Sequence, residues 1–191
     1  MNITIGSDHG ATLLKDEVKM VLAEYGGIRV SDVGTFGTDP VDYPDIAEKV
    51  CADITGGKAE LGIVLCGTGI GISMAANKIK GIRCALCHDV YSAKKAREHN
   101  DANVLAMGGR VLGFGSAGEI VHAFLGAKFE GGRHERRIKK IMQLEAKDWT
   151  SAYCIFKVKV CIHILFILEF CFLDFVQTLC MINSLTPSLM C

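Results

Sequence analysis

Three short stretches of this sequence place a thiol, carboxyl, hydroxyl or imidazole group beside glycine or asparagine. They are Ser7-Asp8-His9-Gly10, Cys66-Gly67-Thr68-Gly69-Ile70-Gly71 and His99-Asn100-Asp101. In the second stretch, glycines that follow a strand and open a helix leave backbone N–H groups available to an anion. The same N–H groups favour the thiolate form of a cysteine that lies just before them. Cys66 is therefore expected to act as a nucleophile or as a base.

A local surplus of positive charge near residue 130 predicts an anion site. Residues 128–140 carry six Lys or Arg and two Glu, whereas the whole chain carries 21 basic and 21 acidic residues. Arg133 and Arg137 are four residues apart, so a helix places both on one face, where they could bind the same phosphate group. A solvated helix face is the alternative interpretation.

Other chemistries have weaker support. The glycine stretch lacks the dinucleotide fingerprint, because its third glycine arrives one position early. Cys51, Cys84 and Cys87 are expected to be small buried apolar residues, since positions three apart in a strand face opposite sides. The spacing of histidine and cysteine resembles no zinc site. These residues therefore give little support to dinucleotide binding or to metal catalysis.

Short apolar runs alternate with segments of helical periodicity over residues 1–143 and define the elements that must position these groups. The runs are Ile3–Ile5, Ile28–Val33, Leu61–Leu65, Ile82–Leu86 and Val104–Met107. This alternation predicts an α/β fold, a doubly wound, Rossmann-like sheet of five parallel strands with helices on both faces. Ligands bind beyond the carboxyl ends of such strands. Asp8, Cys66 and the other polar residues after the strands are expected there.

Charge and cysteine content indicate which partners and which cellular compartment to expect. The balanced net charge leaves no broad field to attract nucleic acid or an anionic membrane. The first residues show no secretion signal, and nine cysteines without a regular framework are typical of a reducing compartment. The protein is expected to be cytoplasmic, without a nucleic-acid partner.

The last 44 residues, 148–191, differ in composition from the rest. They contain no glycine and hold five of the nine cysteines. Their longest charge-free apolar run, Val160–Leu168, is far shorter than the ~20 residues that a membrane helix needs, so a membrane role is disfavoured. We treat this tail as non-native or disordered sequence, with an additional packing element as the alternative.

Several long motifs, in order, closely resemble ribose-5-phosphate isomerase type B. They are SDHG (7–10), DYP (42–44), CGTGIGISMAANK (66–78), HNDANVLAMGGR (99–110) and EGGRHERR (130–137). The resemblance covers residues 1–147 and leaves 148–191 outside it. It implies a homodimer with sites at the subunit interface. It also implies interconversion of ribose 5-phosphate and ribulose 5-phosphate through an enediolate, in the pentose phosphate pathway, without cofactor or metal.

The resemblance also assigns roles to individual residues. It implies Cys66 as the base and His99 as the acid that opens the sugar ring, with help from Thr68 and Asp8. Substrate binding falls to the phosphate ligands His9, Arg133 and Arg137, to Arg110 and Asn100, to Tyr43 in the sugar pocket, and to the loop Gly67, Gly69, Ile70 and Gly71.

Two other functions remain open at this point. The first is isomerisation of a six-carbon sugar phosphate, allose 6-phosphate or galactose 6-phosphate, by the same chemistry. The second is a sugar-phosphate-binding module without turnover. The joint presence of Cys66, Thr68 and His99 favours an enzyme, because a binding protein has no use for a positioned base and acid.

Overall fold

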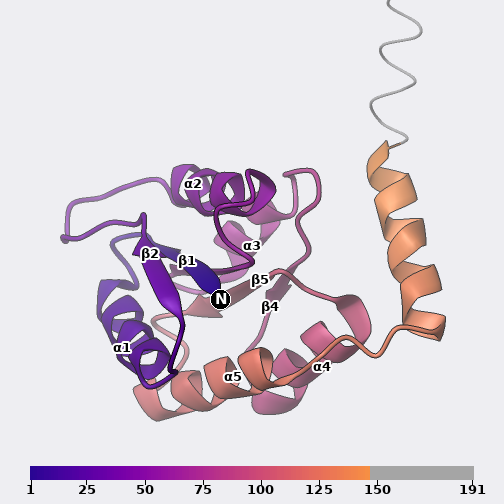
Figure 1. Ribbon diagram of the computed structural model, residues 1–191. Helices are drawn as coiled ribbons and strands as arrows, with labels where there is room; N and C mark the ends of the chain where they lie inside the picture. Colours follow the sequence, from indigo (N-terminus) through magenta and orange to yellow (C-terminus); the bar gives the residue numbers. More distant parts are fainter. Residues whose placement is uncertain (147–191) are drawn as a thin grey trace, which may run out of the picture. The chain divides into compact units, whose positions relative to one another are not determined.

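The computed structural model describes residues 1–146, of which Met1–Met142 form one compact unit. Five strands alternate along the chain with five helices (Figure 1). The strands are β1 (Asn2–Ser7), β2 (Arg29–Asp32), β3 (Leu61–Cys66), β4 (Cys84–Leu86) and β5 (Val104–Gly108). The helices are α1 (Thr12–Ala23), α2 (Tyr43–Thr55), α3 (Ile70–Ala76), α4 (Val90–Asn100) and α5 (Phe114–Gly126), and residues 133–146 are also helical.

All strand pairs are parallel, and the strand order is β2-β1-β3-β5-β4. From β1 the chain moves outward to β2 on one side of the sheet, and from β3 it moves to the edge strand β4 on the other side before it returns to β5. β1 and β3 are thus neighbours at the point where the winding reverses, with Ser7 paired to Leu65. The predicted doubly wound sheet of five strands is confirmed.

Two apolar layers cover the two faces of the sheet (Figure 1). Ile63 and Leu65 pack with the apolar side chains of α1, α4 and α5. Val64 and Cys66, which alternate with them along β3, pack with α2 and α3. β3 is buried along its whole length because both of its faces are covered.

The helix starts follow local sequence signals. Pro44 occupies the first turn of α2, where its missing N–H costs nothing. α4 begins at Asp89, whose carboxylate accepts the Ser92 N–H at 2.8 Å and so satisfies one donor that the helix leaves unpaired.

The cysteines at the predicted structural positions behave as buried apolar groups. Cys51 and Cys87 are fully buried and Cys84 is half-buried, and all three are free thiols. Burial raises the pKa of Cys51 and of Cys87 to about 11 and raises that of Cys84 as well. None of the three is therefore suited to thiolate chemistry near neutral pH.

A buried charge pair connects α1 to the end of β2. The Lys15 ammonium, 2% exposed, lies 2.9 Å from Asp32 Oδ1 and donates to the Thr35 carbonyl at 2.6 Å. Lys19 binds the second oxygen of Asp32, also at 2.9 Å. These bonds hold the start of the segment that runs from β2 to α2 along the carboxyl end of the sheet.

The pair predicts how stability depends on pH. Burial acts to raise the pKa of Asp32, but hydrogen bonds from Lys19 and Lys15 outweigh burial and hold the pKa below its usual value. Its contribution is therefore fully present above the unfolded-state pKa of about 3.9 and is lost as pH falls through the lower folded value. In urea titrations between about pH 5 and pH 3, we expect Asp32→Asn to lose less unfolding free energy than the wild type. Equal losses would contradict this account.

Within residues 1–146, the helices are all too short or too polar to cross a membrane. The tail predicted over 148–191 lies outside the described residues.

Candidate functional site

The loops after β1, β3 and β5 meet at the carboxyl end of the sheet through main-chain contacts. A Cβ added at Gly10 would lie 3.3 Å from the nitrogen of Gly67, and one at Gly108 would lie 2.7 Å from the carbonyl carbon of Thr68. The Gly109 N–H donates to the Cys66 carbonyl at 2.9 Å. Glycine is needed at Gly108 because a side chain would separate the two loops.

Cys66 ends β3 beneath these loops. Its side chain is buried, and the Gly69 N–H donates to its sulfur at 3.1 Å. Gly69 has φ of +78°, and a Cβ there would lie 2.6 Å from Leu86 and 2.9 Å from the Met107 carbonyl carbon. Both the backbone conformation and the contacts require glycine at this position, and that conformation aims the N–H at the sulfur. The hydrogen bond holds the Cys66 sulfur against the glycine loop.

α3 begins directly after this turn, as the glycine pattern predicts. The first N–H groups of an α-helix have no acceptor within the helix, and in α3 they include those of Gly71 and Ile72. The Ile70 N–H donates to Thr68 Oγ1 at 3.3 Å. Since Thr68 Oγ1 accepts this bond, its hydroxyl proton is available to a ligand.

Two larger side chains lie over the glycine loop. A Cβ on Gly71 would lie 2.7 Å from the Tyr43 ring, and one on Gly67 would lie 3.5 Å from the Arg110 side chain. Tyr43 opens α2 and is 39% exposed, and Arg110 follows β5 and is exposed. The two side chains therefore border the space above Cys66 from two different elements.

Asp8 and His9 complete this group after β1. Asp8 is buried, and its Oδ1 accepts the Gly10 N–H at 2.8 Å. The Nδ1 of His9 accepts the Val41 N–H at 3.3 Å. In the neutral imidazole the proton then resides on Nε2, which is free to donate to an anionic oxygen. The sequence did not point to Val41, which contributes its main-chain N–H to this site.

The second group of predicted residues lies at the other end of the sheet. α4 leaves the carboxyl end of β4 and returns to the amino end of β5, and its 11 residues span about 16 Å. His99 and Asn100 are its last two residues. The Arg83 Nε, just before β4, donates to the Asn100 carbonyl at 3.2 Å, which confirms this placement at the amino end.

Arg133 lies in the same region as His99. The ring of His134 stacks on that of His99 with centroids 4.1 Å apart, and the Arg133 Nε donates to His134 Nε2 at 3.2 Å. Arg137 follows one turn later in the same helix. Within one chain, His99, Asn100, Arg133 and Arg137 are therefore separate from Cys66.

The predicted residues thus form two groups. We name the group at the carboxyl end the thiol group: Asp8, His9, Tyr43, Cys66, Gly67, Thr68, Gly69, Ile70, Gly71 and Arg110. We name the group at the amino end the histidine group: His99, Asn100, Arg133 and Arg137. Sequence reasoning missed Glu130 and His134 beside the histidine group, because no regular spacing links them to His99.

A buried thiol at the reversal point of a doubly wound sheet, hydrogen-bonded to a glycine loop, defines an α/β protein with an anion-compatible reactive site. The comparisons with known proteins agree with that class. The chain belongs to the ribose/galactose isomerase family, whose sequence model matches residues 3–141.

Named relatives cover this same region. The chain is 47% identical to ribose-5-phosphate isomerase B of Escherichia coli over 76% of this chain and 97% of that protein. The structure of Clostridium thermocellum ribose-5-phosphate isomerase B matches with a TM-score of 0.75 and 51% identity, over 77% of this chain and 99% of that one. The Mycoplasma genitalium enzyme with bound ribulose 5-phosphate matches with a TM-score of 0.72 and 42% identity, over 76% and 96%.

Proposed function

We propose that the protein interconverts D-ribose 5-phosphate and D-ribulose 5-phosphate. The observation that carries the proposal is the buried Cys66 thiol, whose sulfur accepts a hydrogen bond from the Gly69 N–H. The chain that carries this thiol belongs to the ribose/galactose isomerase family. The relative with bound ribulose 5-phosphate supports the five-carbon substrate. We further propose that the enzyme is cytoplasmic, acts in the pentose phosphate pathway and needs no cofactor.

The proposed chemistry is a proton transfer between adjacent carbons. The Cys66 thiolate removes the proton from C2 of the open-chain aldose, and the electron pair moves to the carbonyl oxygen O1 to give a cis-enediolate. The proton of the C2 hydroxyl moves to O1, and the thiol returns its proton to C1, which leaves a ketone at C2, a hydroxyl at C1 and the thiolate. The N–H groups at the start of α3 stabilise the oxygen on which negative charge develops, an interaction strongest in the transition state.

Ring opening precedes this transfer, because cyclic ribose 5-phosphate has no free carbonyl. We assign the acid to His99, since imidazole can exchange a proton near neutral pH. Asp8 and the Thr68 hydroxyl assist from the thiol group. His9 and the two arginines bind the phosphate, Arg110 and Asn100 bind the sugar chain, and Tyr43 borders it.

A single chain cannot complete this site, because the acid and the two phosphate-binding arginines lie at the far end of the sheet from the base. We propose a homodimer in which each thiol group receives the partner's histidine group. A two-fold axis that forms one such site necessarily forms the second. An open groove of about 450 Å³ along the edge strand β4 supports this contact, since Asn100 lines it together with Leu86, Tyr91 and Ile141.

The direct test is turnover of ribose 5-phosphate in the presence of EDTA, compared with allose 6-phosphate and galactose 6-phosphate. We expect kcat/KM to be highest for the five-carbon substrate. A higher value for either six-carbon substrate would move the assignment to that sugar. Binding of ribose 5-phosphate without turnover of any substrate would support the binding module instead.

The same assay tests the extent of the catalytic domain. We propose that residues 1–147 are the isomerase domain and that 148–191 contribute nothing to catalysis. The family match over residues 3–141 and the compact unit Met1–Met142 support this boundary. A chain ending at Lys147 should then retain the full turnover rate of the 191-residue chain.

A further inference from the structure

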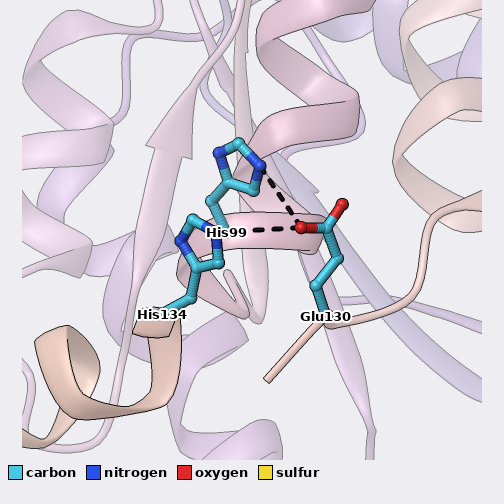
Figure 2. A group of neighbouring side chains, drawn as sticks. All are labelled: His99, Glu130 and His134. Atoms are coloured by element: carbon cyan, nitrogen blue, oxygen red, sulfur yellow. Dashed lines mark ion pairs between the residues drawn. The ribbon is translucent and has the colours of Figure 1, made fainter. Parts of the chain in front are cut away.

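Three potential metal ligands from separate segments meet beside the histidine group. His99 lies in the last turn of α4, Glu130 lies in the segment after α5, and His134 lies in the last described helix (Figure 2). Glu130 Oε2 lies 3.6 Å from His99 Nε2 and 3.7 Å from His134 Nε2. Figure 2 shows the Glu130 carboxylate facing both imidazoles, and the three ligand atoms lie within 4.8 Å of one another.

Main-chain bonds hold these segments together independently of the side chains. The Glu130 N–H donates to the Glu98 carbonyl near the end of α4 at 3.0 Å. Gly131 and Gly132 both have positive φ, and the His134 N–H donates to the Gly131 carbonyl at 3.0 Å. This turn reverses the chain within two residues and returns His134 to the His99 ring. The backbone therefore preorganises the cluster.

Two of the three distances between the ligand atoms are close to those of a zinc site. Zinc binds imidazole nitrogen and carboxylate oxygen at about 2.0–2.1 Å, and tetrahedral geometry then separates ligand atoms by about 3.3 Å. The two measured distances from Glu130 exceed this value by only a few tenths of an ångström. Two histidines and one carboxylate leave the fourth tetrahedral position for water or a ligand.

The ring arrangement indicates what must move when an ion binds. The two imidazoles are nearly parallel, at 8°, so their Nε2 lone pairs run side by side and do not converge. His134 is buried, whereas the His99 side chain is 30% exposed and can turn toward Glu130. Arg133, which is exposed, must release His134 Nε2.

We propose that His99, Glu130 and His134 bind one Zn²⁺ ion per chain and that the zinc-bound enzyme is inactive. The inhibitory part rests on the proposed function, because zinc at His99 Nε2 occupies the nitrogen that would carry the ring-opening proton. Zinc fits the two imidazoles and one carboxylate better than Mg²⁺ or Ca²⁺, which prefer all-oxygen sites. The site is thus a point of reversible inhibition by metal.

Binding should be measured without activity first, in a Cys66→Ala background that removes the thiol of the proposed active site. Titration against a chromophoric zinc chelator should give one tight ion per chain. Glu130→Gln and His134→Gln should each weaken binding by at least about 10-fold, the lower limit for loss of even an indirect metal partner. Glu135→Gln, an exposed acid in the same helix, is the matched control and should bind as before.

Cobalt identifies the ligands. Co²⁺ bound to this site should show visible d–d bands without the near-ultraviolet thiolate-to-cobalt absorption, since the proposed ligands are two nitrogens and one oxygen. Because Glu130 is half-exposed, Glu130→Gln should remain folded even if the buried His134 variant does not. Equal zinc affinity in Glu130→Gln and its parent, or a thiolate band, would overturn the proposal.

Activity separates this inference from the proposed function. In the enzyme with Cys66 intact, Zn²⁺ should abolish ribose 5-phosphate turnover, EDTA should restore it, and Glu130→Gln should raise the inhibitory zinc concentration by at least about 10-fold. Zinc binding with no isomerase activity even in EDTA would overturn the proposed function and leave the metal site standing. If Glu130→Gln keeps its isomerase activity with unchanged zinc sensitivity, the proposed metal site would be overturned and the proposed function would stand.

Discussion

Replacement of Cys66 by alanine should lower kcat for ribose 5-phosphate by about 10²–10⁴-fold, the usual contribution of a positioned base. The thiol is the base proposed to reach C2, and the Gly69 N–H donates a hydrogen bond to its sulfur. Affinity for the substrate should change much less, because the phosphate ligands are unaltered. Steady-state kcat and KM, measured together with a binding titration, check this result.

Hydrogen exchange at C2 provides a second measurement of the same step. Wild-type enzyme in D₂O should exchange the C2 hydrogen of ribose 5-phosphate with solvent, and Cys66→Ala should not. Cys51→Ala is the matched control, because it also removes a buried thiol from the α2–α3 side of the sheet but not from the carboxyl end. Undiminished exchange in Cys66→Ala would rule out the thiol as the base.

Two inactive chains should restore activity when they form a mixed dimer. Cys66→Ala lacks the base and His99→Ala lacks the acid, so each homodimer has two defective sites. A mixed dimer regains one intact site, built from the unaltered thiol group of one chain and the unaltered histidine group of the other. Random pairing of equal amounts should therefore give about a quarter of the wild-type activity.

Co-expression of the two chains with different affinity tags, followed by sequential purification, isolates the mixed dimer for this assay. The comparison is a co-expressed pair of Cys66→Ala and Thr68→Ala chains, both altered in the thiol group, which should stay inactive together. Absence of recovery in an isolated mixed dimer would place acid and base within one chain and contradict the proposed arrangement.

The five strands could be predicted from the sequence because each one is marked by residues that are close together along the chain. Apolar runs bounded by polar and glycine residues identified all five strands, and Pro44 marked the start of α2. The strand β2 was the least distinct, since its residues are exposed or half-buried at the sheet edge. Lys15 was not predicted to be buried, because its partner Asp32 comes from a different element.

The thiol group was predictable for a related reason, since its residues follow strands whose carboxyl ends must lie together. The histidine group was not located from sequence. His99 stands five residues before the fifth apolar run, but the length of α4 carries it to the opposite end of the sheet. Glu130 and His134 reach it only through the turn at Gly131 and Gly132, and no spacing in the sequence reports such a contact.

The glycine contacts among the strand-end loops mean that the residues that position Cys66 differ from those that border the space above it. Gly10, Gly67 and Gly108 let main chain touch main chain, so the sulfur of Cys66 is positioned by atoms that every amino acid shares. Substitutions elsewhere in the core leave that sulfur in place unless they move whole strands. Tyr43 and Arg110, which we propose border the sugar, are partly or fully exposed, so their side chains can change without disturbing these main-chain contacts. Substitutions at these two positions should alter the fit of the substrate and leave the position of the sulfur unchanged.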